Sequence, residues 1–551
     1  MGRDVARQSF TRRERQQYRG RVHRCLNALA MMLREGAFAG DVEATIGLEV
    51  ELNLIDHRFE PAMRNTAVLD GVDTPELTSE LGRWNVELNL PPRSLPGEQV
   101  RYLENHLLDL ISQIEKKAET VGAKVLAIGI LPTLSEDDLT TDLLSPSNRF
   151  AVLNEQILSA RGEPVRLDID ATGTAADQDN EQTFATAGTG LGGFGWSDGA
   201  RADQDGNEPA AGRWHRDTAV GAGDRCAVPA ERLQMDFDSI APEAACTSLQ
   251  LHLQVPPDAF AANWNAAQSV AGIQLAVGSN SPFLLGRRLW AETRVPLFLQ
   301  ATDVRTPELR NQGVRPRVWF GERWINSIFE LFEENVRYFP GLLPVAGTQD
   351  PQVELAEGRV PTLEELRLHN GTIWRWNRPI YDVADGMPHL RVENRVLPAG
   401  PSVLDMIANA VFFYGLLRVL TEQDRPVWAN MPFSAAEENF MRAARDGMDT
   451  TLYWPDDGWI APDQLVLHRL LPMAADGLAN WGVTDAVSGR YLDVIERRCA
   501  TRRTGSAWQV HTVGALEEAG ADRPAALRGM LERYLDGMTC NAPVHTWPLP
   551  R

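Results

Sequence analysis

Apolar and polar residues alternate with a period of two in four separate stretches of the chain. This pattern predicts β-strands that bury one face and carry polar side chains on the other. The polar faces are Glu49, Glu51 and Asn53 in residues 45–55; Asn85, Glu87 and Asn89 in residues 84–90; Ser248, Gln250, His252 and Gln254 in residues 247–255; and Arg391, Glu393 and Arg395 in residues 389–397. A solvated sheet face explains any one of these strands, but the shared chemistry of all four favours a common site.

Helical periodicity, together with Gly and Pro residues that end regular elements, predicts the elements in the rest of the chain. Helices are expected at residues 11–35, 98–121 and 260–277, from just after Pro401 to about 420, in aromatic-rich segments of 319–338, and over most of 426–551. A further strand is expected at 124–131. We therefore expect an α+β fold with a helical segment (1–40), a catalytic domain (41–425) and a mainly helical region (426–551). Residues 171–229, rich in Gly, Asp and Ala, are predicted to be a flexible insertion.

The composition excludes several classes of function. A formal net charge of −21 argues against nucleic-acid and anionic-membrane partners. We expect no signal peptide and no membrane span, and the five scattered cysteines, without CxxC spacing, indicate neither a disulfide framework nor a zinc site. A cytoplasmic location is expected. The only lysines, Lys116, Lys117 and Lys124, do not form a GK[ST] phosphate loop.

The polar strand faces have the chemistry of a metal site. If the strands adjoin, Glu49, Glu51, Glu87 and Glu393 repel one another unless some protonate or cations neutralise them. Oxygen ligands with at most one imidazole, that of His252, suit Mg²⁺ or Mn²⁺ better than zinc. Such a metal cluster typically holds nucleotide phosphates.

Two arginine-rich clusters accompany the strands. Residues 367–379 contain Arg367, Asn370, Arg375 and Arg378 among tryptophans, and we favour carboxylate or phosphate binding there over cation–π packing. For residues 315–324, a packing role is the preferred interpretation.

The stretches GLEVELNL, SELGRWNVELNLPPR, CTSLQLHLQV and LRVENRVLPAGPSVLDMIANA resemble glutamate–cysteine ligase family 2. This is the carboxylate–amine ligase type within the glutamine synthetase-like superfamily, and the stretches look close to its long actinobacterial-type members. The resemblance implies a curved, mainly antiparallel sheet that forms a funnel, with ATP at one end, the amino acid at the other and metals between them.

The resemblance also implies roles for individual residues. The implied metal ligands are Glu49, Glu51, Glu80, Glu87 and Glu393. Arg391 matches a position that contacts nucleotide phosphates, and Arg395 matches one near the amino-acid substrate, so both are candidate catalytic residues. Related enzymes often have HxH in the third strand where this chain has Gln250-Leu251-His252, which leaves open whether Gln250 or His252 approaches the metal.

The implied reaction uses ATP as co-substrate and Mg²⁺ or Mn²⁺ as cofactor. The γ-carboxylate of glutamate becomes an acyl phosphate, and the amine of cysteine displaces phosphate. Three alternatives remain: another amine acceptor, including ammonia; a metal-dependent phosphohydrolase; and a non-enzymatic interaction or sensing module. Neither the oligomeric state nor the role of residues 426–551 is predicted.

Overall fold

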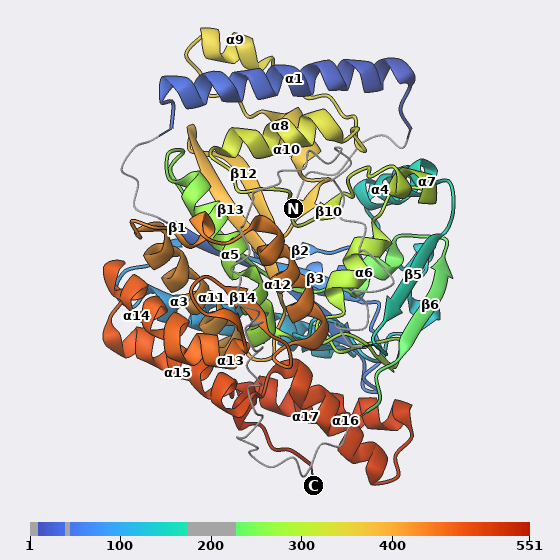
Figure 1. Cartoon of the computed structure of the whole chain (residues 1–551). Coiled ribbons are helices and arrows are strands. Elements are labelled where there is room, and N and C mark those ends of the chain that lie inside the picture. The colour runs from blue at the N-terminus through green and yellow to red at the C-terminus, as the bar shows by residue number, and fades with distance from the viewer. Residues whose placement is uncertain (1–8, 39–44, 174–227, 551) are drawn as a thin grey trace, which may run out of the picture.

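The computed structural model describes residues 9–38, 45–173 and 228–550. The predicted insertion therefore lies almost entirely outside the described residues. At the centre is an antiparallel sheet with the order β12-β13-β7-β1-β3-β2, and β4 pairs with the end of β1 (Figure 1). Its strands are β1 (Thr45–Ile55), β2 (Leu77–Ser79), β3 (Asn85–Ser94), β4 (Lys124–Leu126), β7 (Ser248–Gln254), β12 (Asn377–Ala384) and β13 (Met387–Pro398). The predicted α+β class and the mainly antiparallel sheet are confirmed.

The strand register brings the predicted polar faces together. Glu51 lies opposite Glu87 in the pair β1–β3, and Glu49 lies opposite Gln250 in the pair β1–β7. In the pair β13–β7, Glu393 lies opposite His252. Because residues that are paired across neighbouring strands point to the same face, the four polar patterns form one continuous surface.

The other face of the sheet packs against helices. These include α3 (Gln99–Thr120), α5 (Phe260–Gly278) and α11 (Val403–Thr421). In α11 the hydroxyl of Tyr414 donates to the carbonyl oxygens of Gly47 and His252, at 3.2 and 3.1 Å, which ties the helix to β1 and β7. By length and composition alone α11 could span a membrane, but 89% of its apolar window is buried inside the protein, as expected of a core helix.

The N-terminal helix α1 (Arg12–Glu35) lies across one end of the molecule beside α8 (Ile328–Tyr338), α9 (Pro351–Ala356) and α10 (Glu364–Asn370) (Figure 1). It begins with a capping box formed by Thr11 and Glu14. Tyr18 donates to the carbonyl oxygen of Glu365 at 3.0 Å, and Arg21 pairs with the Glu365 carboxylate at 2.9 Å. These contacts hold α10, which carries two of the predicted site residues.

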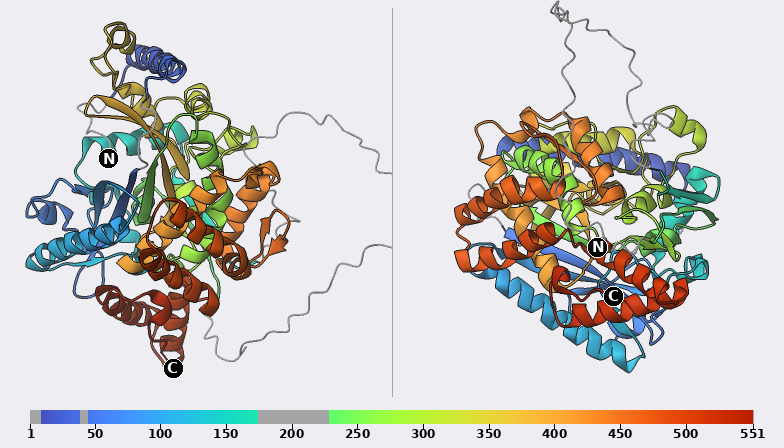
Figure 2. Two further views of the ribbon diagram at one scale, coloured as in Figure 1. Left: turned by 90° about the vertical axis from the view of Figure 1, so that its left-hand side faces the viewer. Right: turned by 60° about the horizontal axis from the view of Figure 1, so that its bottom comes forward.

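The C-terminal helices extend from the middle of the molecule to the end opposite α1, where the last two helices of the chain lie (Figure 1 and Figure 2). A buried ion pair between Arg498 and Asp405, at 2.7 Å, joins α15 to α11. The helices are α12 (Phe433–Asp446), α13 (Pro462–Leu465), α14 (Leu471–Asn480), α15 (Asp485–Thr501), α16 (Gly505–Glu518) and α17 (Arg523–Thr539), and a short hairpin joins β14 (Leu452–Trp454) to β15 (Gly458–Ile460). The predicted helical character of this region is confirmed.

Smaller elements complete the described chain. They are α2 (Asn65–Leu69), α4 (Asn148–Arg161), α6 (Arg294–Ala301), α7 (Pro307–Asn311), β5 (Val165–Asp170), β6 (Arg232–Phe237), β8 (Phe283–Leu284), β9 (Arg287–Arg288), β10 (Val318–Trp319) and β11 (Trp374–Arg375).

Two predicted elements differ from the structure. The strand predicted for residues 124–131 ends at Leu126, because the carbonyl of Ile128 accepts hydrogen bonds from the side chains of Asn53 and Thr247 instead of from a strand. The helical segment predicted from Trp319 begins at Ile328, since Val318–Trp319 forms a parallel bridge with β11.

Candidate active site

A cavity of about 660 Å³ lies over the polar face of the sheet. Every residue singled out from the sequence as a metal ligand or substrate contact lines it: Glu49, Glu51, Glu80, Glu87, Gln250, His252, Arg367, Asn370, Arg375, Arg378, Arg391, Glu393 and Arg395. The sequence patterns therefore converge on one place in the fold.

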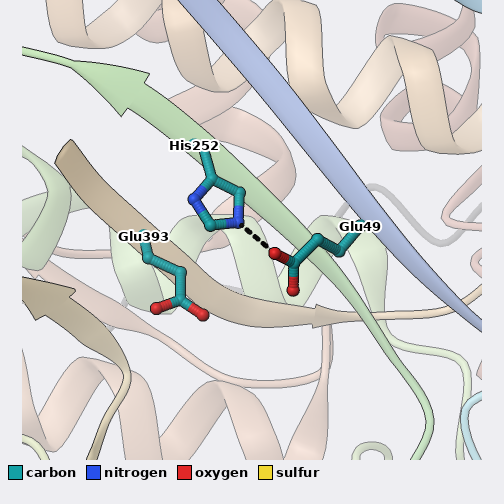
Figure 3. Close-up of side chains that lie close together, drawn as sticks. All are labelled: Glu49, His252 and Glu393. Carbon is teal, nitrogen blue, oxygen red and sulfur yellow. Dashed lines mark ion pairs between the residues drawn. The ribbon is translucent and has the colours of Figure 1, made fainter. Parts of the chain in front are cut away.

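The first cluster in the cavity, the Glu49 group, consists of Glu49, His252 and Glu393. One potential ligand atom from each residue lies within 4.8 Å of the others. His252 Nε2 is 3.1 Å from Glu49 Oε1, and the Glu393 carboxylate lies beside them on the neighbouring strand (Figure 3). Three adjacent strands thus each contribute one side chain.

The second cluster, the Glu51 group, consists of Glu51, Glu80 and Glu87, with the same spacing of ligand atoms. Glu51 and Glu87 come from β1 and β3, and Glu80 comes from the turn between β2 and β3. Glu80 Oε2 is buried and has no hydrogen-bond partner among the described residues. Glu80 thus lies beside two of the other implied metal ligands, Glu51 and Glu87.

The Glu51 group is electrostatically strained. Burial, and next the charge of Glu49, raise the pKa of Glu87 to about 8. Burial followed by the charge of Glu87 raises the pKa of Glu80 well above its usual range, and burial also raises the pKa of Glu51. These carboxyl groups bind protons tightly because burial and their mutual repulsion outweigh the attraction of Arg395.

The Glu49 group is partly neutralised by the protein. Burial alone raises the pKa of both its carboxyl groups, but His252 lowers the pKa of Glu49 to about 2. The pKa of Glu393 is lowered by Arg378 and Arg395. Arg378 makes a two-pronged contact with Glu393, with distances of 2.6 and 2.8 Å, and Arg395 donates to the same carboxylate at 2.8 Å.

Gln250 connects the two clusters without belonging to either. Its Nε2 donates to Glu51 Oε1 at 2.9 Å, and its Oε1 accepts a hydrogen bond from Arg395. The second carboxylate oxygen of Glu51 accepts from the backbone N–H of Ser248 at 2.7 Å. Of the two candidates in the third strand, His252 lies beside the carboxylates of Glu49 and Glu393, and the Gln250 amide is hydrogen-bonded to Glu51. Which of the two approaches a metal stays a prediction.

Arginines gather at the end of the site where Arg391 lies opposite Gln254. Arg367 pairs with Asp382 at 2.7 Å, and Arg391 is 3.5 Å from the same carboxylate. Arg391 Nη1 also lies 2.8 Å from the Nε2 of His389. This end of the cavity can receive the oxygens of a polyanion.

Two further residues that were predicted to contact substrate, Arg375 and Asn370, interact with other residues of the protein. Arg375 is buried, pairs with Glu334 at 2.9 Å and stacks 4.5 Å over the ring of Trp319; burial lowers its pKa to about 10. Asn370 donates to the carbonyl of Pro379 at 2.8 Å. Their proposed roles toward substrate thus stay predictions.

The arginines of residues 315–324 confirm the packing interpretation. Arg315 stacks 3.7 Å over Tyr338 and pairs with Glu322, while Arg317 is buried and donates to the carbonyl of Thr372 at 3.0 Å. No residue of this cluster lines the cavity.

Sequence reasoning missed three acidic residues of the cavity wall, Glu243, Glu364 and Asp382. Glu243 lies in a short 3₁₀ turn, Ala241–Ala245, just before β7. Burial, and then Glu51, raise its pKa to about 8. A turn has no alternating pattern, so no periodicity in the sequence marked this residue.

The residues present fit divalent cations. The two clusters offer carboxylate oxygens and one imidazole, which is the donor set of hard to borderline divalent ions. The raised pKa of Glu87 and the buried, unpartnered Glu80 Oε2 both indicate negative charge that a cation would neutralise.

Comparisons with known proteins agree with this chemistry. The family model of glutamate–cysteine ligase family 2 matches residues 45–491. No match is found among curated protein sequences.

Two solved structures are similar in outline. A glutamate–cysteine ligase from Francisella tularensis, crystallised with AMP, is 11% identical, with a TM-score of 0.48, and the alignment covers 91% of this chain and 90% of that one. A bifunctional glutathione synthetase from Pasteurella multocida is 10% identical, with a TM-score of 0.44 and coverage of 93% and 54%. These scores are low, and we base no conclusion on them. The family match spans well over half of the chain, so the protein belongs to glutamate–cysteine ligase family 2 and is an ATP-dependent carboxylate–amine ligase.

Proposed function

We propose that this protein is a glutamate–cysteine ligase, which joins the γ-carboxylate of glutamate to the amine of cysteine and converts ATP to ADP and phosphate. The observation that carries the proposal is the single cavity in which two ligand clusters adjoin an arginine-rich end. The family supports the reaction class, and the choice of glutamate and cysteine as substrates is our proposal.

The order of the side chains along the strands indicates how ATP and the acid substrate would lie relative to each other in the cavity. Arg391 lies opposite Gln254, the pair of Glu393 and His252 comes next, and Glu51 lies farther along the same face. We place the triphosphate of ATP at the arginine-rich end and the acid substrate beyond it. The γ-phosphate and the γ-carboxylate then meet between the Glu49 group and the Glu51 group.

Divalent cations, with Mg²⁺ the proposed one, would be held by the Glu49 and Glu51 groups and would offset the charge of the phosphates and the reacting carboxylate. Arg391 would contact the nucleotide phosphates. Arg395, which Glu393 and Gln250 hold in place, would stabilise the charge that develops near the acyl group. Gln250 and Ser248 keep both oxygens of Glu51 oriented.

In the first step an oxygen of the γ-carboxylate attacks the γ-phosphorus, and the bond to ADP breaks. In the second, the amine of cysteine attacks the acyl carbon, phosphate leaves and the amine loses a proton. Positioning and charge stabilisation supply the rate enhancement, and no covalent bond to the protein is needed.

The test is ADP release by the purified protein with Mg²⁺, ATP and glutamate, with and without cysteine and with a panel of other amines. Glu51→Gln serves as the inactive comparison. Cysteine-dependent turnover that the variant loses supports the proposal, and turnover with another amine only assigns a different acceptor. ADP release that needs no amino acid would indicate a phosphohydrolase instead, and no turnover under any condition would favour a non-enzymatic role.

A further inference from the structure

Glu243 is a carboxylate of the cavity wall that belongs to neither ligand cluster. Its side chain makes no hydrogen bond or ion pair with any residue in the described parts of the chain. The charged groups that interact with it are Glu51, Glu80 and Arg395. Glu243 is half-buried in the cavity wall, and an unpaired carboxylate in a substrate cavity points to a ligand.

Two arginines of the cavity wall are already engaged with other residues. Arg395 donates to Glu393 and to Gln250. Arg294, which also lines the cavity, pairs with Glu292 at 3.0 Å and donates to the carbonyl of Val396 at 2.7 Å. Neither guanidinium is therefore the partner of Glu243, and a cationic group of the substrate can take that place.

Glu243 and the arginine-rich end lie at opposite ends of the site. The chain leaves the turn that carries Glu243 and enters β7 at Ser248, whose backbone N–H contacts Glu51. β7 then runs to Gln254, which lies opposite Arg391. The cavity thus offers positive charge at one end of β7 and an unpaired carboxylate at the other.

We propose that Glu243 binds the non-reacting α-ammonium group of the acid substrate. The inference rests on the proposed function, which places the reacting γ-carboxylate between the ligand clusters and facing the phosphates. The rest of the substrate then extends away from the arginines and toward Glu243. The α-ammonium keeps its charge throughout the reaction, so a lasting ion pair suits it.

The amine of the acceptor is a poorer partner for Glu243. That amine has to lose its proton in order to attack the acyl phosphate, and a neighbouring carboxylate favours the protonated, unreactive form. An ion pair with the acid substrate does not hinder the reaction, because the α-ammonium group of that substrate does not react. It orients the bound acid and discriminates against dicarboxylates that lack the ammonium group, because such substrates leave Glu243 unpaired.

The test compares glutamate with glutarate, which has the same carbon chain and both carboxylates but no ammonium group. We would measure kcat/KM for both acids, and KM for ATP and for cysteine, in the wild type, Glu243→Gln and Glu437→Gln. Glu437 is a matched control, since burial also raises its pKa but it does not line the cavity. The isosteric glutamine keeps the shape of the wall.

We expect the wild type to prefer glutamate by about ten- to a hundredfold, and Glu243→Gln to lose most of this preference through a higher KM for glutamate. The KM for ATP stays within about twofold, as does every constant of Glu437→Gln. An unchanged preference in Glu243→Gln, or a rise in the KM for cysteine alone, overturns the inference while leaving the ligase intact. Absence of any glutamate-dependent ligation by the wild type defeats the proposed function itself, and the inference with it.

Discussion

Glu51 and Glu87 face each other across the antiparallel pair of β1 and β3, and both carboxylates are buried. Glu80 joins them from the turn that precedes β3. Without a cation this arrangement is tolerable only when some of the carboxyl groups are protonated. The three carboxyl groups in the middle of the catalytic sheet therefore need positive charge, which either protons or a cation can supply.

The metal-free protein should lose stability as the pH rises. The pKa of Glu87 is about 8 in the folded protein against an ordinary value of 4.5, so the folded state binds the proton more tightly than the unfolded state. Its contribution is fully present below the unfolded pKa and is lost as the pH rises through about 8. Thermal unfolding midpoints in the presence of a chelator, from about pH 5.5 to about pH 8.5, measure the effect.

Saturating Mg²⁺ should weaken this pH dependence, because the cation takes the place of the protons. The variant Glu87→Gln should also weaken it and should unfold at a higher temperature than the wild type at the alkaline end. A metal-free wild type whose midpoint stays flat or rises with pH would contradict the interpretation of the Glu51 group.

Replacing His252 and replacing Gln250 should have different effects on metal affinity. His252 belongs to a ligand group, whereas Gln250 orients Glu51 and Arg395 through its amide. We expect His252→Ala to raise the concentration of Mn²⁺ needed for half-maximal activity by more than about a hundredfold, and Gln250→Ala by about tenfold. Titration of both variants with Mn²⁺ measures this, and equal shifts would show that the amide acts as a ligand.

The sequence allowed the strands and their polar faces to be predicted because alternation is a local property. β1 spans Thr45–Ile55, as expected, and β7 spans Ser248–Gln254 within the predicted 247–255. The division into two clusters was not predictable, since it depends on the register that sets His252 opposite Glu393 and Glu51 opposite Glu87. Register arises from long-range pairing, which a local pattern does not encode.

Residues outside regular strands were harder to interpret. Glu243 lies in a turn, where no period distinguishes a cavity residue from an exposed one. Arg375 was predicted to contact substrate, yet its guanidinium pairs with Glu334 on α8, a partner about forty positions away in the sequence. Only the folded structure shows which charges are already neutralised.

Breaking the contact between Arg378 and Glu393 should destabilise the protein. Arg378→Met leaves Glu393 buried without one of its two guanidinium partners, and we expect the free energy of unfolding to fall by about 3 kcal/mol at neutral pH. Denaturant unfolding in a chelating buffer measures the loss. The double variant Arg378→Met, Glu393→Gln should recover part of it, and no recovery would show that packing of the arginine stem causes the effect.

Substitution of Arg375 should mainly lower stability, and substitution of Arg391 should mainly weaken nucleotide binding, although both arginines line the same cavity. Arg375 is buried and paired with Glu334, so Arg375→Met should lower the free energy of unfolding by about 3 kcal/mol, because that carboxylate then keeps only the more exposed Arg323 as an ion-pair partner. Arg391 is more exposed, and Asp382 contacts it only at 3.5 Å. Arg391→Met should therefore change stability by less than about 1 kcal/mol.

The same two variants should show the reverse order in kinetics. Loss of a phosphate contact should raise the KM for ATP by about tenfold or more in Arg391→Met, whereas in Arg375→Met it should change by less than about threefold once folding is complete. Denaturant unfolding and initial rates at several ATP concentrations give both quantities for each variant. If Arg375→Met instead weakened ATP binding without loss of stability, the pairing with Glu334 would have to open when the nucleotide binds, and Arg375 would belong with the phosphate contacts.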